Sequence, residues 1–252
     1  MSNISPQAVI ERGAQVAADA IVGPFTYIGP HVCIGPGCVI GNNATVTGRT
    51  TLGEKTRVFP MAVIGVSSEG SDEAECILGK ANSIREHVTL YGGSRVPTRI
   101  GNDNLIMISC VVGPGASIGD HGIIVNGTMI GAEARVDDYI HTSAFVTIGQ
   151  GVSVGAYTFI AGYADVDHDA PPYAIIQGSP FRVRGVNAEK LKRCGFGEDD
   201  IRALKEAFRE LFDGEGSTAD EEAISRLSSP ASNPHVRRLV SAIVADKSKR
   251  RR

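Results

Sequence analysis

Aliphatic residues recur at every sixth position of this chain over long stretches. An α-helix repeats every 3.6 residues and a strand every two, so neither produces this pattern. A six-residue period is typical of hexapeptide repeats and predicts a left-handed parallel β-helix, with three hexapeptides in each coil. The positions are Ile10, Val16, Val22, Ile28, Ile34, Ile40, Val46, Leu52, Val58 and Ile64, then Ile100, Ile106, Val112, Ile118, Ile124, Ile130 and Val136, and after Thr142 also Ile148, Val154, Ile160 and Val166.

Glycine directly follows many of these aliphatic residues, for example at Gly23, Gly101 and Gly131. We expect each such glycine at a corner, where the chain turns sharply and a positive φ is useful. Residues 18 apart should stack vertically at about 4.8 Å, and each coil completes the core of its neighbours. Residues 7–168, less their interruptions, predict eight or nine coils.

The six-residue spacing breaks twice. Ile64 and Leu78 lie 14 residues apart, and Leu90 and Ile100 lie 10 apart. The excess residues predict two ejected loops, at about 66–76 and 91–99. Loops that leave a rigid solenoid often form a wall of a binding face, although neutral surface insertions are an alternative.

The repeat ends after residue 169, which divides the chain into two predicted domains. Residues 1–184 form the β-helix, and residues 185–252 form an α-helical domain with a basic tail. The helical domain also covers the open edge of the last coil, which would otherwise invite aggregation.

Four helices are predicted in the second domain. Asn187 can cap a first helix that runs through Leu191, and residues 197–212 have amphipathic helical spacing. Ser217 with Glu221 suggests a third helix, and Pro234 begins a fourth.

Composition excludes several classes of partner. The net charge of −3 gives no global attraction to nucleic acid, and the basic cluster at 247–252 fits a solvated tail better than a binding patch. No apolar stretch approaches the ~20 residues of a membrane span, and no secretory signal is apparent. The five cysteines are odd in number and lack CxxC spacing, so neither structural disulfides nor a metal site is expected. These features predict a cytoplasmic protein.

Several segments of the chain resemble one known family, the UDP-N-acetylglucosamine O-acyltransferases that begin lipid A synthesis. The resemblance covers essentially the whole chain, and its most specific part is the first segment of the helical domain. It implies a homotrimer with active sites in clefts between subunits, and no bound cofactor. It also implies transfer of a 3-hydroxyacyl chain from an acyl carrier protein thioester to the 3-hydroxyl of a UDP-sugar. The segments are SIREHVTL (83–90), GNDNLIM (101–107), VDDY (136–139), PPY (171–173) and GVNAEKLKRCGF (185–196).

The chain departs from the family at the position of its catalytic base. The resemblance aligns the family's basic histidine with Pro114, and three further family histidines with Val111, Glu133 and Gly149. The side chains of valine, proline and glycine cannot accept a proton. The resemblance therefore implies a family member with an altered or absent general base.

Other family positions are retained. Gln150 matches an active-site glutamine two coils above Pro114. By resemblance, Asn187, Glu189 and Arg193 bind the nucleotide-sugar, whereas the arginine expected next is Cys194.

The position that sets acyl length in the family is Gly162 in this chain. A glycine there would admit a longer acyl chain. The geometry of the repeat is an alternative explanation for the same glycine.

Three residues are candidates to replace the base. Glu133 follows Ala132, which stacks one coil above Pro114, so Glu133 should lie within about 5–8 Å of the altered position. A desolvated carboxylate can act as a base, but Glu133 also fits a solvent-facing repeat position. His121 and His141 lie on other sides of the prism, where they either contribute across a trimer cleft or are ordinary surface or interface histidines.

Three functions stay open on the sequence alone. The first is acyl transfer from acyl carrier protein to a nucleotide-sugar. The second is non-catalytic binding of the nucleotide-sugar or the acyl carrier protein, which the loss of several histidines would explain. The third is acetyl transfer from coenzyme A, which occurs among hexapeptide proteins, although the helical domain argues against it.

Overall fold

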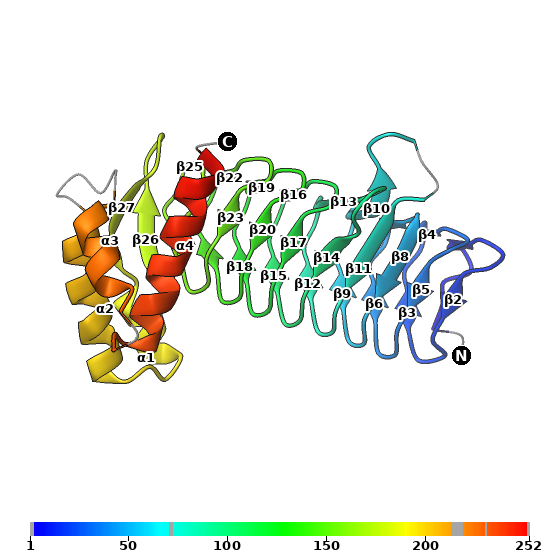
Figure 1. Ribbon diagram of the computed structural model, residues 1–252. Helices are drawn as coiled ribbons and strands as arrows, with labels where there is room; N and C mark the ends of the chain where they lie inside the picture. Colours follow the sequence, from blue (N-terminus) through cyan, green and yellow to red (C-terminus); the bar gives the residue numbers. More distant parts are fainter. Residues whose placement is uncertain (1–2, 71–72, 213–218, 230, 251–252) are drawn as a thin grey trace.

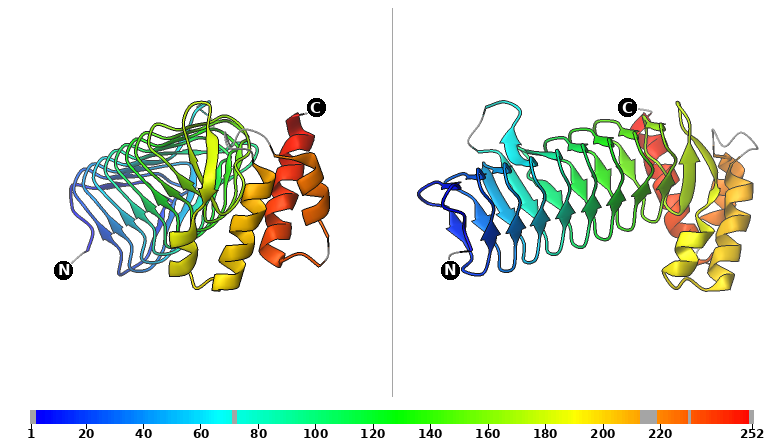
Figure 2. Two further views of the ribbon diagram at one scale, coloured as in Figure 1. Left: turned by 90° about the vertical axis from the view of Figure 1, so that its left-hand side faces the viewer. Right: turned by 180° about the vertical axis from the view of Figure 1, so that it is seen from behind.

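The chain folds into a three-sided prism of stacked β coils with a helical domain at its C-terminal end (Figure 1). The computed structural model describes residues 3–70, 73–212, 219–229 and 231–250. Each complete coil contributes one short strand to each of three sheets, so the prism has a triangular outline when viewed obliquely from its C-terminal end (Figure 2, left). The predicted fold class, a parallel β-helix followed by a helical domain, is confirmed.

We name the three sheets face 1, face 2 and face 3, in the order in which the chain crosses them. Face 1 comprises β1 Val9–Ile10, β4 Tyr27–Ile28, β7 Thr45–Val46, β10 Val63–Ser67, β13 Thr89–Gly92, β16 Val111–Val112, β19 Met129–Ile130, β22 Thr147–Ile148 and β25 Asp165–Val166. Face 2 comprises β2 Gln15–Val16, β5 Cys33–Ile34, β8 Arg49–Leu52, β11 Glu75–Leu78, β14 Thr98–Ile100, β17 Ser117–Ile118, β20 Arg135–Val136 and β23 Ser153–Val154. Face 3 comprises β3 Ile21–Val22, β6 Val39–Ile40, β9 Arg57–Val58, β12 Ser83–Ile84, β15 Leu105–Ile106, β18 Ile123–Ile124, β21 His141–Thr142, β24 Phe159–Ile160, β26 Ala174–Gln177 and β27 Arg182–Val186.

The periodic aliphatic residues form the core of the prism. Residues 18 apart pair in register, as Ile10 does with Ile28, and side chains such as Ile28 and Ile64 are completely buried. Thr142 interrupts the aliphatic series but is also buried, and its hydroxyl oxygen accepts a hydrogen bond from the Val125 backbone N–H at 2.9 Å. A buried hydroxyl with a partner avoids the desolvation cost of an unpaired group.

The glycines after the aliphatic residues have a different role from the one expected. Gly131 lacks a positive φ, but a Cβ placed on it would lie 2.6 Å from the backbone nitrogen of Gln150 in the next coil. Positive φ occurs two residues later, at non-glycine residues such as Asp103 and Glu133 (both 56°). The expectation of a positive φ was therefore wrong at Gly131, where glycine allows the neighbouring coil to approach closely, whereas Gly65, which follows Ile64, does have a positive φ of 79°.

Both ejected segments leave the prism between face 1 and face 2, and we call this edge the loop edge. Residues 68–74 connect β10 to β11, and residues 93–97 connect β13 to β14. The connections are shorter than the expected 66–76 and 91–99 because β10 and β13 remain paired as far as Ser67 and Gly92. The end of β10 and the residues that follow it as far as residue 70 rise above the prism in Figure 1 and are seen from behind in Figure 2, right.

The described part of the C-terminal domain contains four helices. These are α1 Ala188–Arg193, α2 Glu198–Leu211, α3 Glu221–Leu227 and α4 Pro234–Arg250. Strand β27 pairs antiparallel with β26, so the domain boundary expected after residue 184 falls inside a strand. No helix among the described residues is long and apolar enough to cross a bilayer.

One predicted helix cap differs from the structure, and one helix start involves a residue outside the described part of the chain. Asn187 precedes α1, but its side chain makes no capping hydrogen bond. Its Nδ2 instead donates to the Tyr157 carbonyl oxygen at 2.9 Å. Asp220 caps α3 by accepting a hydrogen bond from the Ala223 backbone N–H, whereas Ser217 lies outside the described residues.

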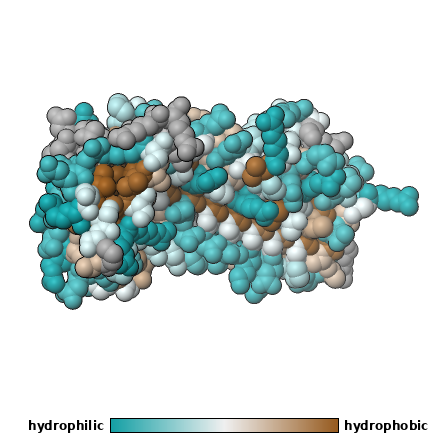
Figure 3. Space-filling model, in the orientation of Figure 1, coloured by the Kyte–Doolittle hydropathy of each residue, from teal (hydrophilic) through white to brown (hydrophobic). Residues whose placement is uncertain are grey.

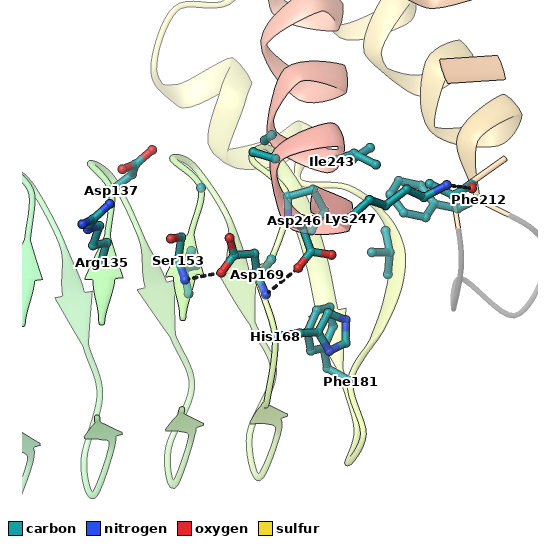
Figure 4. A pocket seen from close by; sticks show the side chains of 18 residues that line it. Arg135, Asp137, Ser153, His168, Asp169, Phe181, Phe212, Ile243, Asp246 and Lys247 are labelled. Atoms are coloured by element: carbon teal, nitrogen blue, oxygen red, sulfur yellow. Dashed lines mark hydrogen bonds between the residues drawn. The ribbon is translucent and has the colours of Figure 1, made fainter. Parts of the chain in front are cut away.

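Helix α4 lies against the C-terminal end of face 2, with a cavity of about 370 Å³ between them (Figure 4). Hydrogen bonds join groups in this cavity: Asp169 accepts from the Ser153 N–H, and Asp246 accepts from the Asp169 N–H. The imidazole of His168 stacks on Phe181, with ring centroids 4.1 Å apart. We interpret this cavity as the junction of the two domains. Figure 3 shows the molecule in the orientation of Figure 1, with an apolar patch over the helical domain.

Candidate functional site

The loop edge contains a cavity of about 250 Å³ beneath the two ejected segments. Pro114, Ala132, Glu133 and Gln150 line it from three successive coils, together with residues 68–69 and 93–96 of the ejected segments. Stacking along the repeat predicts this grouping of Pro114, Glu133 and Gln150. Their chemical roles stay predictions.

Glu133 occupies the corner next to Pro114. Its backbone N–H donates to the Pro114 carbonyl oxygen at 3.0 Å, and its φ is 56°. A Cβ added to Gly115 would meet the Glu133 Cγ at 3.2 Å, so the stem of the glutamate lies over that glycine. The side chain is exposed and has no ion-pair partner among the described residues. An exposed carboxylate therefore stands beside Pro114, the position at which the resemblance places the family's base.

The backbone N–H of Ala132 is a second chemical group at this edge. It has no hydrogen-bond partner among the described residues, because this corner position makes no bond to the adjacent coil. Pro30 and Pro114, which have no N–H, occupy the equivalent position at the loop edge of other coils. An unpaired N–H in a cavity can donate to a developing oxyanion.

His141 lies elsewhere, on the outer surface of face 3. It is half-buried and meets Phe159 edge to face, with ring centroids 5.5 Å apart. Burial lowers its pKa, and the positive charges of Lys190 and Arg193 lower the pKa further. These two cations belong to α1, so His141 lies beside that helix.

His121 belongs to a stack of rings along the edge between face 2 and face 3, which we call the tyrosine edge. His121 stacks on Tyr139 at 4.7 Å, and Tyr139 stacks on Tyr157 at 4.9 Å. The Nδ1 of His121 lies 4.0 Å from a carboxylate oxygen of Asp103. Within one chain, His121 is at a different edge from Glu133.

The three residues expected to hold the nucleotide-sugar lie at or in α1. Asn187 is only 9 % exposed, and its amide is engaged with Tyr157, so at least one of its hydrogen bonds is structural. Glu189 and Arg193 are exposed on α1, and Glu189 lies 3.9 Å from Lys192. The ammonium of Lys190 lies 5.4 Å from the Tyr139 ring, which places α1 beside the tyrosine edge.

Gly162 lies at the remaining edge, between face 3 and face 1. A Cβ there would lie 3.3 Å from the Ala144 carbonyl oxygen and 3.5 Å from the Ser143 hydroxyl. These distances are far less restrictive than the 2.6 Å contact at Gly131. A Cβ at position 162 would thus be tight against one carbonyl oxygen without overlapping the backbone, so close approach of neighbouring coils requires glycine there less strictly than at Gly131.

Sequence reasoning missed one residue of the loop-edge cavity, Arg95. It lies in the second ejected segment, lines the cavity and is exposed. The periodic pattern could not identify it, because an ejected segment has no repeat position. Its cation and the carboxylate of Glu133 are thus both available at the loop edge. Among the described residues, no group of His, Cys, Asp and Glu is arranged to hold a metal ion.

The fold and the loop-edge cavity define a hexapeptide-repeat transferase. The bacterial transferase hexapeptide family matches residues 13–48, and the family described as UDP-N-acetylglucosamine O-acyltransferase, domain 2, matches residues 169–251. This chain belongs to the UDP-N-acetylglucosamine O-acyltransferase family.

Its relatives are similar over most of their length. An acyl-(acyl-carrier-protein)–UDP-N-acetylglucosamine O-acyltransferase of Myxococcus xanthus is 43% identical over 84% of this chain and 85% of its own. One of Pseudomonas fluorescens is 34% identical over 92% of both. The crystal structure of the Moraxella catarrhalis UDP-N-acetylglucosamine O-acyltransferase superposes with a TM-score of 0.89 at 26% identity, covering 97% of this chain and 98% of that one. A Bacteroides fragilis structure gives 0.87 at 31% identity, covering 94% and 95%.

Proposed function

We propose that this protein transfers an acyl chain from acyl carrier protein to UDP-N-acetylglucosamine, in sites formed between the subunits of a homotrimer. The relatives named above carry this activity in their names. The loop-edge cavity is the observation that carries the proposal, because it collects Glu133, Gln150 and both ejected segments around the altered base position.

The surface chemistry of the prism supports a trimer. Large apolar side chains are exposed along the edge between face 3 and face 1, which we call the apolar edge: Phe25 (61%), Met61 (50%), Phe145 (55%) and Tyr163 (75%). Face 2, by contrast, carries the charged residues Arg49, Arg99 and Arg135 and is partly covered by α4. The exposed apolar side chains of the apolar edge favour burial of that edge against a partner. The outward residues of face 1 are uncharged until its last strand: Val9, Tyr27, Thr45, Val63, Thr89, Val111, Met129 and Thr147.

A trimer with the apolar edge at its threefold axis would place face 3 of one subunit against face 1 of the next. The loop edge of one subunit would then lie beside the tyrosine edge and α1 of its neighbour. Glu133 and His141 belong to the same coil, between β19 and β21, so they would lie at similar height on opposite walls of the cleft. Gly162 would lie near the axis, where an apolar acyl chain can be buried.

In this cleft, we assign Glu133 the role of general base. Its carboxylate takes the proton of the sugar 3-hydroxyl as that oxygen attacks the thioester carbonyl carbon. The Ala132 N–H donates to the oxyanion of the tetrahedral intermediate. The intermediate collapses by breaking the carbon–sulfur bond, and the protonated Glu133 returns its proton to the departing thiolate of the carrier. No resident cofactor takes part, because the donor thioester is itself a substrate.

We place this reaction in the cytoplasm. All five cysteines are unpaired, and Cys76 and Cys110 are buried in the prism. Free thiols are typical of proteins in a reducing compartment.

A second function, nucleotide-sugar binding without turnover, is favoured by a different observation. By resemblance, Pro114 stands at the family's base position, and no histidine lines the loop-edge cavity within the described residues. In that case α1 and the cleft would bind the nucleotide-sugar, but Glu133 would not ionise the acceptor hydroxyl.

Direct assay separates these functions. Purified protein is incubated with UDP-N-acetylglucosamine and 3-hydroxyacyl carrier proteins of several chain lengths, and mass spectrometry detects the acylated nucleotide-sugar. We expect product with wild-type protein and a loss of about 10²- to 10⁴-fold in Glu133→Gln. Calorimetric binding of UDP-N-acetylglucosamine with no product from any donor would refute the transferase and support the binding function. Product from acetyl-coenzyme A alone would contradict both.

A further inference from the structure

The segment that carries Arg95 is anchored at both ends at the loop edge. The segment 93–97 is fixed at its start by two backbone hydrogen bonds between Gly93 and Glu75, each 3.0 Å long. It is fixed at its end by a hydrogen bond of 2.8 Å from the Gly115 backbone N–H to the Thr98 hydroxyl. A Cβ on Gly93 would overlap the Val96 carbonyl oxygen, so the turn between them is tight. The segment is therefore a short, anchored turn that carries one cation.

The charge of Arg95 has no counterpart in the described part of the chain. No described carboxylate forms an ion pair with its guanidinium, although Arg95 lines the same cavity as Glu69 and Glu133. Its side chain is exposed. An unpaired arginine in a substrate cavity offers a planar donor set that matches two oxygens of a phosphate group.

The opposite wall of the proposed cleft has fewer cations than the family resemblance implies. Helix α1 carries Lys190, Lys192 and Arg193, but the residue after Arg193 is Cys194 rather than the second arginine that the resemblance implies. A nucleotide-sugar brings a diphosphate into this cleft, and acyl carrier protein brings the phosphodiester of its prosthetic arm. A cation on the loop edge would offset the one that α1 lacks.

We propose that Arg95 binds a phosphate group of a substrate, acting from the loop edge of one subunit while Arg193 acts from α1 of the next. This inference rests on the proposed function, because it requires the cleft between subunits. Arg95 is a binding residue in this account, and the reaction steps assigned to Glu133 do not involve it.

Binding measurements test the inference without relying on turnover. Calorimetry compares UDP-N-acetylglucosamine binding to wild type, Arg95→Ala, Arg95→Lys and the control Arg99→Ala. Arg99 is an exposed arginine on β14 that does not line the cavity. We expect Kd to rise about 10- to 100-fold in Arg95→Ala, less in Arg95→Lys, and to stay unchanged in Arg99→Ala. The wild-type Kd should also depend more steeply on salt concentration than that of Arg95→Ala.

A second arm identifies which phosphate is bound. If the Kd for UDP-N-acetylglucosamine is unchanged while the KM for acyl carrier protein rises in Arg95→Ala, the phosphate is that of the carrier. The inference is overturned if Arg95→Ala and Arg99→Ala have the same Kd for UDP-N-acetylglucosamine, the same KM for acyl carrier protein and the same thermal unfolding curve. Failure of the proposed function has a different signature, since wild-type protein would then form no acylated product whatever the effect of Arg95 on Kd.

Discussion

Replacing Gly131 and Gly162 by alanine should have very different effects on stability. At Gly131 the new Cβ would lie 2.6 Å from the Gln150 nitrogen and 2.8 Å from the Gly149 carbonyl carbon. Both atoms are backbone, and the coils above and below limit any shift of either one. At Gly162 the nearest atom, the Ala144 carbonyl oxygen, is 3.3 Å away.

The magnitudes follow from these contacts. Overpacking of a rigid interior costs about 1–3 kcal/mol, and Gly131→Ala belongs at the upper end because no flexible side chain can move aside. For a chain of this size, 1 kcal/mol corresponds to about 2–4 °C in Tm, so we expect a fall of about 6–12 °C. Gly162→Ala should change stability by no more than about 0.5 kcal/mol, or about 2 °C.

Thermal unfolding followed by circular dichroism measures both variants under the same conditions. Wild-type protein and a surface substitution such as Arg99→Ala serve as references. Equal destabilisation at Gly131 and Gly162 would refute the close-approach argument. It would also revive the explanation that repeat geometry alone requires glycine at position 162.

Three further predictions concern the site. Glu133→Asp should retain more transferase activity than Glu133→Gln, because a carboxylate remains. An equal loss of kcat in the two variants would contradict the role of Glu133 as the base. Gly162→Met should shift the preferred acyl donor to shorter chains in a competition assay, and an unchanged preference would remove Gly162 from the acyl groove. The pKa of His141, followed by NMR, should rise toward its ordinary value in Lys190→Ala, because a nearby positive charge is removed; no rise would contradict the placement of α1. Folding lowers this pKa, so the unfolded chain binds a proton at His141 more readily than the folded chain does. The contribution of His141 to the free energy of unfolding is therefore fully present above its unfolded pKa, and it is lost as pH falls through the folded pKa.

The sequence predicted much of the architecture because the repeat is strictly local. A period of six residues determines which side chains point inward, and the breaks at Ile64 and Leu90 located both ejected segments. Counting along the repeat also grouped Glu133 with Gln150, since stacking in a β-helix follows directly from residue number. The physical reason for glycine after each aliphatic residue was not predictable in this way, because it depends on how closely the next coil approaches.

The rest of the site required three-dimensional information. Arg95 lies in an ejected segment that has no repeat position, so only the folded loop places it in the cavity. The amide of Asn187 is bonded to Tyr157, a contact between residues 30 apart in sequence that no local cap signal predicts. Placing Glu133 and Arg193 at separate edges requires the orientation of α1 against the prism, which depends on packing between the two domains.

The central claim is that each site combines the loop edge of one subunit with α1 of its neighbour. Mixed trimers test it most directly. Glu133→Gln and Arg193→Ala subunits are unfolded together, refolded in equal amounts and assayed at a low concentration of UDP-N-acetylglucosamine, beside each variant alone. If the halves come from different subunits, random assembly gives about one site in four with both halves intact, so activity should recover to about a quarter of the wild-type value. If both halves belong to one chain, every site carries a substitution, and activity no higher than that of the separate variants would contradict the account.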